Sequence, residues 1–209
     1  KKFLYNYADY IIAINSQSKK ELLNLGIQKH KIRIFNNPSL KKNFFKKAQE
    51  KISNKNIIKN KYLLYVGRLT FHKNLNFLIK VFNEVQKKIK LNLVLIGQGD
   101  EIYNLKKLVK NLGIEKKVFF LGYKKNPLPY IKKADLYLSF SEYEGQPNSV
   151  IQSLGCGTKT LIKTFPGLNK NIKKHIQFLK KNITDQNKYN EKFSEIFQNM
   201  EIFENENEI

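Results

Sequence analysis

The chain has 209 residues, 41% of them hydrophobic and 12% aromatic, and this composition excludes an intrinsically disordered chain. The formal net charge of +22 favours anionic partners such as phosphates, nucleic acid or an acidic membrane face. The single cysteine, Cys156, excludes an internal disulfide, and no apolar run approaches the ~20 residues that span a bilayer, so we expect a cytoplasmic protein.

The first 40 residues predict a strand, a helix and a second strand. We expect the strands at residues 10–14 and 31–35, and between them a helix that begins at a capping box formed by Ser18 and Glu21 and ends at Gly26. Residues 41–60 are rich in lysine and asparagine and lack alternation, so this segment is predicted to be a linker.

From residue 62 onward, short apolar runs alternate with helical patterns. Nearly continuous apolar runs are typical of parallel strands that are covered on both faces. These runs are YLLYVG, LNLVLIG, KVFFLG, DLYLSF and, as a fifth strand, TKTLIKTF. We therefore predict an α/β fold with a doubly wound parallel sheet over residues 61–185. Residues 186–209 are expected to form a C-terminal helix and tail, with a short helix near Ile172 before them.

Ligands of such sheets bind beyond the carboxyl ends of the strands. After the first strand, Arg68 and Lys73 lie five residues apart, where a guanidinium and an ammonium can both reach a diphosphate. Two solvated cations are the alternative reading. It is weakened because Arg68 is one of only two arginines in the chain.

After the fourth strand comes the segment SEYEGQPNSV. Pro147 suits the first turn of a helix, which would leave the amides of Asn148 and Ser149 free to face an anion. Gly145 permits close backbone approach, and Glu144 could accept hydrogen bonds from sugar hydroxyls or, alternatively, cap the helix.

Other site chemistries find little support. Gly97 and Gly99 follow a strand, but Ile102 stands where a dinucleotide fingerprint needs its third glycine, so we interpret this segment as a tight turn. The three histidines are scattered and there is no D-x-D pair, so we expect no metal site.

Three segments together resemble the group 1 glycosyltransferases, which are retaining enzymes of the GT-B fold. They are ADYIIAINSQSKKELLNLGI, VGRLTFHKNLNFLI and FLGYKKNPLPYIKKADLYLSFSEYEGQPNSVIQSLGCGT. The motifs occur in the family's order and spacing over most of residues 8–168. The resemblance implies that residues 1–40 end an N-terminal acceptor domain and that residues 61–185 form the Rossmann-like domain that binds a nucleotide-sugar donor.

The resemblance also implies roles for particular residues. Arg68 and Lys73, in the element that begins at Gly67, would bind the donor diphosphate. Glu144 would contact the hydroxyls of the transferred sugar and the developing positive charge, without a metal or any cofactor. The remaining expected donor contacts are Gly122 and Tyr123 near the nucleobase, and Gly145, Gln146, Pro147, Asn148 and Ser149 near the phosphates and sugar.

The sequence departs from the family pattern at two places. The second glutamate of the family motif, which holds the donor ribose, is Gln152 here, so the charge-assisted part of that contact is lost, at a cost on the order of 1 kcal/mol. The glycine-rich segment expected after the fifth strand is reduced to Pro166 and Gly167.

We therefore expect a glycosyltransferase, in a truncated chain, that transfers a sugar from a UDP- or GDP-sugar to a glycan or lipid-linked acceptor with retention. The lysine-rich surface favours peripheral contact with an anionic membrane on its cytoplasmic side, and no nucleic acid is expected. The alternative is a catalytically inactive lysine-rich module that binds polyanions such as nucleic acid or anionic membrane.

Overall fold

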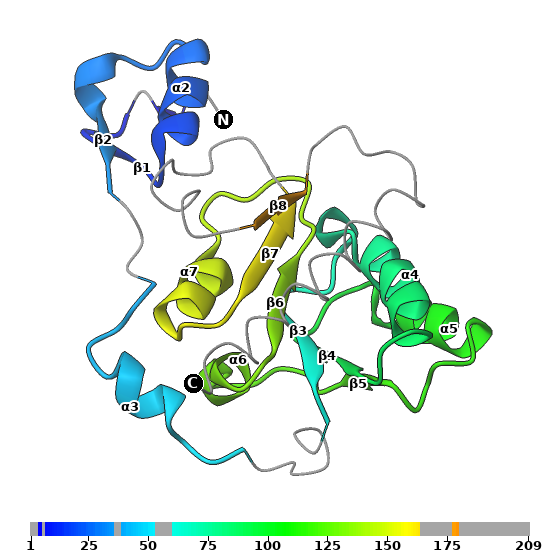
Figure 1. Cartoon of the computed structure of the whole chain (residues 1–209). Coiled ribbons are helices and arrows are strands. Elements are labelled where there is room, and N and C mark those ends of the chain that lie inside the picture. Colours follow the sequence, from blue (N-terminus) through cyan, green and yellow to red (C-terminus); the bar gives the residue numbers. More distant parts are fainter. Residues whose placement is uncertain (1–3, 6, 36–38, 53–59, 164–176, 180–209) are drawn as a thin grey trace.

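The computed structural model describes residues 4–5, 7–35, 39–52, 60–163 and 177–179. It contains a small N-terminal unit and a larger α/β body (Figure 1). The helices expected near Ile172 and at the C-terminal end lie outside the described residues. Among the described residues, no helix is long and apolar enough to cross a membrane.

The N-terminal unit is a strand, a helix and a parallel strand, as the sequence predicts. Its elements are β1 (Ile11–Ala13), α2 (Ser16–Asn24), the 3₁₀ turn η1 (Lys29–Lys31) and β2 (Ile32–Ile34). The predicted capping box is wrong. Asn15 caps the helix, because its side chain accepts the backbone N–H of Ser18 at 2.7 Å. Gly26, with a φ of 79°, follows the helix in the left-handed conformation.

A helix, α3 (Phe44–Ala48), lies within the segment predicted to be a linker. Its residues Phe44 and Ala48 are buried and belong to the same apolar cluster as Ile52. The helix contacts α6 (Leu128–Lys132), and Asn126 donates to the carbonyl of Lys47 at 2.9 Å. Part of this segment is therefore packed against the α/β body.

The body is built on a six-stranded sheet in which every recorded pairing is parallel. The strands are β3 (Tyr62–Val66), β4 (Asn92–Ile96), β5 (Val118–Phe120), β6 (Leu136–Ser139), β7 (Thr160–Lys163) and β8 (Gln177–Leu179). The first five are the predicted strands, whereas β8 was not predicted. Their near-continuous burial explains why the sequence shows apolar runs rather than alternation.

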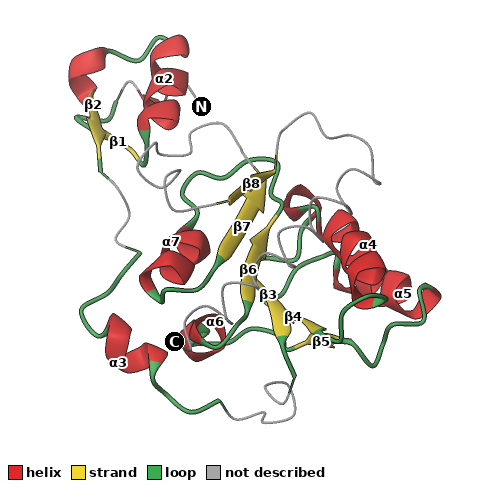
Figure 2. Cartoon of the chain, viewed as in Figure 1, coloured by secondary structure: helices red, strands yellow, loops and turns green. Residues whose placement is uncertain are grey.

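Helices cover both faces of the sheet (Figure 2). The helices α4 (Leu75–Gln86) and α5 (Ile102–Asn111) share one apolar cluster with the side chains of Leu63 and Tyr65. The helices α3, α6 and α7 (Asn148–Gly155) share the other cluster with Tyr62 and Leu64. Alternate residues of β3 thus face opposite helical layers, which confirms the predicted doubly wound fold.

The strand order is β5-β4-β3-β6-β7-β8, so the direction of winding reverses between β3 and β6. In open parallel sheets, the loops that follow the two strands at such a switch point diverge and leave a crevice at the carboxyl edge. Here these loops carry Arg68 and Lys73 after β3, and Glu144 after β6.

Gly97 and Gly99 have a packing role in the loops after β3 and β4. A Cβ atom at Gly97, whose φ is 146°, would lie 1.8 Å from the carbonyl oxygen of Gly67, and one at Gly99 would lie 2.1 Å from that of Leu69. The same loops are joined by a hydrogen bond of 2.9 Å from the N–H of Leu69 to the carbonyl of Gln98. Glycine is required here because two backbones touch.

Candidate functional site

An ion pair joins the two loops of the switch point. The Nζ of Lys73, at the end of the 3₁₀ turn η3 (Phe71–Lys73), lies 2.6 Å from Oε1 of Glu144. The two side chains are 13% and 19% exposed, so both charges are largely withdrawn from water. A pair so placed is weakly screened by solvent, although both side chains keep some exposed surface.

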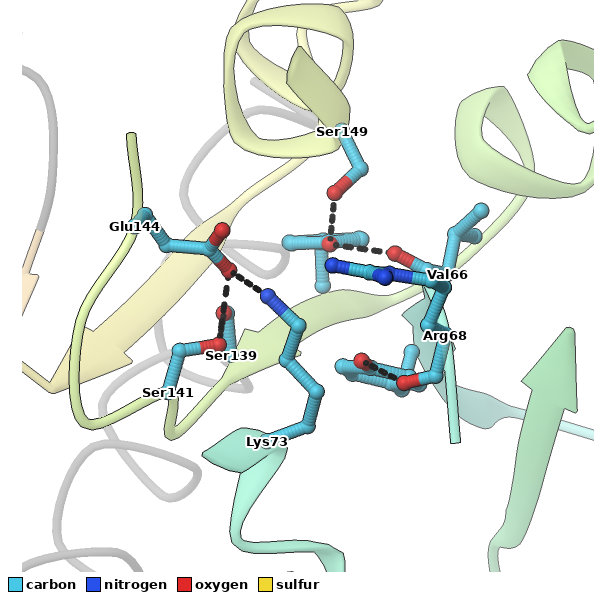
Figure 3. Close-up of polar contacts among 9 residues, drawn as sticks. Val66, Arg68, Lys73, Ser139, Ser141, Glu144 and Ser149 are labelled. Carbon is cyan, nitrogen blue, oxygen red and sulfur yellow. Dashed lines mark hydrogen bonds and ion pairs between the residues drawn. The ribbon is translucent and has the colours of Figure 1, made fainter. Parts of the chain in front are cut away.

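Serine side chains further orient the carboxylate of Glu144 (Figure 3). The hydroxyl of Ser141 donates to Oε1 of Glu144 at 2.8 Å, and it lies 3.4 Å from the hydroxyl of Ser139. The carboxylate is thus held at Oε1, which accepts from both an ammonium and a hydroxyl. These contacts preorganise the negative charge of Glu144 at the carboxyl edge of the sheet.

The side chain of Arg68 is exposed and points toward the Lys73–Glu144 pair (Figure 3). Its backbone is fixed, because the hydroxyl of Tyr65 donates to its carbonyl oxygen at 2.9 Å. Burial raises the pKa of Tyr65 far above its usual value, so the phenol remains a donor. The loop after β3 therefore presents a guanidinium from a rigid base.

A second tyrosine connects β3 to the helix α7. The hydroxyl of Tyr137, on β6, lies 2.7 Å from Oγ of Ser149 and 3.3 Å from the carbonyl oxygen of Val66. Burial raises the pKa of Tyr137 as well, which keeps its proton available. Ser149, a predicted site residue, is thus held at the first turn of α7.

Glu142 also ties the two loops together. Its backbone N–H donates to the carbonyl of His72 at 3.0 Å. Its carboxylate accepts from Lys163 at 2.7 Å and from Asn74 at 3.3 Å. The contacts with His72 and Asn74, on either side of Lys73, hold the loop after β3 next to the loop that carries Glu144.

The start of α7 differs in detail from the prediction. Pro147 occupies the N-cap instead of the first turn. The prediction that the backbone amide of Asn148 is free is wrong, because this N–H donates to the carbonyl of Gln146 at 2.9 Å. This hydrogen bond joins residues only two positions apart, because the chain turns sharply between Gly145 and the helix. Of the two backbone amides predicted to face an anion, only that of Ser149 therefore remains a candidate.

Several residues predicted to contact the donor also have protein partners. The side chains of Gln146, Asn148 and Gln152 all bond to Ser39. A Cβ at Gly145 would lie 2.6 Å from Cδ1 of Ile14, and the Gly145 carbonyl accepts from the side chain of Asn15. The close approach at Gly145 is therefore made by the N-terminal unit.

The expected nucleobase residues lie on the loop after β5. Gly122 adopts a φ of 64°, and its carbonyl accepts the N–H of Gly97 at 2.9 Å, which aligns this loop with those after β3 and β4. Tyr123 is 69% exposed beside it. The structure thus places them at the same edge of the sheet, on a neighbouring loop.

The sequence interpretation missed Ser39, Tyr137, Ser139 and Ser141. Ser141 had a signal, since it follows a strand directly at the carboxyl edge. Tyr137 lies within an apolar run that indicates only a strand, and Ser39 is far from its partners in sequence. Within the described ranges, no three His, Cys, Asp or Glu side chains gather into a group that could hold a metal ion.

Comparison with known proteins supports the fold and identifies the family. Residues 46–207 match the family model of the glycosyl transferases group 1. A relative from Campylobacter jejuni, N-acetylgalactosamine-N,N'-diacetylbacillosaminyl-diphospho-undecaprenol 4-alpha-N-acetylgalactosaminyltransferase, is 35% identical over 73% of this chain and 40% of its own length. Alpha-monoglucosyldiacylglycerol synthase of Streptococcus pneumoniae is 29% identical over 78% of this chain and 35% of its own length.

Solved structures share the fold. WaaG, a glycosyltransferase involved in lipopolysaccharide biosynthesis, matches with a TM-score of 0.74 and 18% identity over 88% of this chain and 52% of its own. HepE of Anabaena, solved in complex with UDP and glucose, matches with a TM-score of 0.64 and 18% identity over 78% of this chain and 46% of its own. These matches identify the body as the Rossmann-like half of a GT-B fold.

The chain spans about 40% of the length of the first curated relatives it matches. The family match covers all strands of the body and both loops that carry Lys73 and Glu144. The fold, the order of the motifs and the family model agree, and the chain belongs to the group 1 glycosyltransferases.

Proposed function

We propose that this chain forms the donor-binding part of a retaining, metal-independent glycosyltransferase. It binds a UDP- or GDP-sugar as substrate, without another cofactor, and transfers a hexose or N-acetylhexosamine to a glycan or lipid-linked acceptor. The observation that carries the proposal is the ion pair between Lys73 and Glu144, 2.6 Å apart at the switch point of the sheet.

Opposite charges at this point suit the reaction. When the bond from the anomeric carbon to the diphosphate oxygen breaks, negative charge builds on the diphosphate and positive charge on the sugar. Arg68 and Lys73 would stabilise the leaving diphosphate, with the first turn of α7 at Ser149. Glu144 would accept hydrogen bonds from the sugar hydroxyls and stabilise the positive charge at the anomeric carbon.

The names of relatives support a lipid-linked acceptor. One acts on an undecaprenol diphosphate carrier, and another makes a glucosyldiacylglycerol. A chain with a net charge of +22 would be attracted to the anionic lipids that surround such acceptors. We therefore place the whole enzyme at the cytoplasmic face of a membrane, bound peripherally.

Calorimetric titration of the purified chain with UDP, GDP and ADP tests the donor site. We expect one nucleotide to bind with micromolar affinity and Arg68→Ala to weaken it by about 1.5–3 kcal/mol, because a charge-assisted contact is lost. Arg33→Ala is the matched control, since Arg33 is the other arginine and lies on β2 in the N-terminal unit. It should change nothing.

The alternative of a polyanion-binding module makes the opposite prediction. All three nucleotides would then bind alike, binding would decline steeply with salt, and Arg68→Ala would have no greater effect than Arg33→Ala. That pattern would contradict the proposed donor site.

A further inference from the structure

Ser39 makes an unusual set of contacts with the donor motif. Its hydroxyl donates to Oδ1 of Asn148 at 2.6 Å and accepts from Nε2 of Gln146 at 3.2 Å. Its backbone carbonyl accepts from Nε2 of Gln152 at 3.3 Å. These four residues, Ser39, Gln146, Asn148 and Gln152, are referred to below as the latch.

The hydroxyl of Ser39 fixes the orientation of two side-chain amides. A hydroxyl has one proton to donate and lone pairs to accept, and here it uses both capacities. It donates to the side-chain oxygen of Asn148 and accepts from the side-chain nitrogen of Gln146. The nitrogen of Asn148 is consequently turned away from Ser39 and can serve as a donor to an anion.

The amide of Gln152 is chemically matched to its partner. A carbonyl oxygen can only accept, so the residue opposite the Ser39 carbonyl must donate. Glutamine donates through Nε2, whereas an ionised glutamate has only acceptor oxygens and would repel the carbonyl. The glutamine in place of the family's glutamate therefore has a structural reason here.

Apolar packing next to the latch holds the following segment in place. A Cβ at Gly155, near the end of α7, would lie 3.0 Å from Cδ2 of Leu40 and 3.1 Å from Cζ of Phe44. The helix α3, which starts at Phe44, packs on α6. Residues 39–48 thus run along α7 and are fastened at its N-terminal end by polar contacts.

We propose that the latch positions Gln146 and Asn148 for the donor, with Ser39 and Gln152 as positioning residues that do not themselves hold the ribose. Binding of the nucleotide and docking of residues 39–48 then stabilise each other, because both use the same orientation of the two amides. The docking part stands on the contacts alone, and the coupling to the nucleotide rests on the proposed donor site.

Two measurements on the full chain test the proposal. Hydrogen exchange of residues 40–48 without nucleotide should be roughly fivefold faster in Ser39→Ala and Gln152→Glu, as expected for the loss of about one hydrogen bond. Titration with UDP and GDP should show roughly three- to tenfold weaker binding in both variants. Ser39→Thr keeps the hydroxyl, so its exchange rate and its nucleotide affinity should equal those of the unmodified chain.

The control is Asn111→Asp, the same amide-to-carboxylate change as in Gln152→Glu, at an exposed position at the end of α5. It should leave both measurements unchanged. Tighter nucleotide binding by Gln152→Glu would overturn the proposal, because it would mean that the side chain at 152 holds the ribose. Unchanged exchange in both latch variants would also overturn it.

The two proposals fail in distinguishable ways. If no nucleotide binds the unmodified chain, the donor site and the coupling fall together, while faster exchange in the variants would still support the docking. If a nucleotide binds through Arg68 but Ser39→Ala binds it equally well, the donor site stands and the positioning role is contradicted.

Discussion

The N-terminal unit and the α/β body are both built from parallel strands and helices, yet they differ in how many of their apolar side chains are buried. The body has two apolar clusters on opposite faces of its sheet, and strands such as β4 are wholly buried. The unit has a small cluster of Ala13, Ile27 and Ile32, and none of the nine residues of α2 is fully buried.

This difference indicates that the α/β body is more stable than the N-terminal unit. A two-stranded parallel sheet lacks the area to stabilise itself, and parallel strands are normally covered on both faces. Ile12, on β1, is 65% exposed. We expect the body to fold cooperatively and the unit to open first.

The largest effect should come from the same substitution made in the two regions. Ile79→Ala, on α4, removes a side chain that is 0% exposed and should lower the free energy of unfolding by about 2–5 kcal/mol. Ile12→Ala should change it by less than about 0.5 kcal/mol. Urea denaturation of both variants makes the comparison, and equal losses would contradict it.

The backbone contact at the body's edge should be nearly as sensitive. Gly97→Ala would drive a Cβ into the carbonyl of Gly67, and we expect a loss of about 3 kcal/mol in unfolding free energy. Gly113→Ala is the matched control, since Gly113 has a φ of 67° but nothing within 4 Å of the added atom. Its cost should be about 1 kcal/mol.

Removal of the carboxylate at the switch point should affect binding and stability differently. Glu144→Gln releases the ammonium of Lys73, so the diphosphate of UDP should bind roughly threefold tighter, a gain of about 0.7 kcal/mol. Stability should fall by about 1–2 kcal/mol, because Lys73 loses its counter-charge. Calorimetry and denaturation measure the two quantities. Weaker nucleotide binding would show that the carboxylate does not compete for Lys73.

The smallest expected effect is the alkaline response of the buried tyrosines. The folded-state pKa of Tyr65 is raised above its unfolded value of 10.0, mainly by burial. The stabilisation is therefore complete below pH 10 and is lost as the pH rises further. Tyr65→Phe should lower stability at pH 8 by about 1 kcal/mol and flatten the decline above pH 10. Thermal unfolding at several pH values measures both, and parallel profiles would contradict the assignment.

The sequence allowed the body to be predicted because its signals are local. Apolar runs marked β3 to β7, and the positions after β3 and β6 placed Lys73 and Glu144 at one edge of the sheet. Their shared edge follows from the topology, since parallel strands end at a common edge. The ion pair itself is seen only in the structure.

Features that depend on contacts between distant segments could not be predicted. Ser39 lies in a stretch without periodicity, and its partners follow more than 100 residues later. The need for glycine at position 97 depends on how two loops pack. Asn15, and not Ser18, is the N-cap because the helix begins earlier than the capping pattern suggests. Strand β8 has too short an apolar segment to be recognised.

The central claim is that a nucleotide diphosphate binds between the loops after β3 and β6, and a crystal structure of this chain with UDP would test it most directly. The account predicts the diphosphate within hydrogen-bonding distance of the Arg68 guanidinium and the Lys73 ammonium, beside the first turn of α7. A diphosphate bound elsewhere on the lysine-rich surface, with no ligand contacting Arg68 or Lys73, would contradict it.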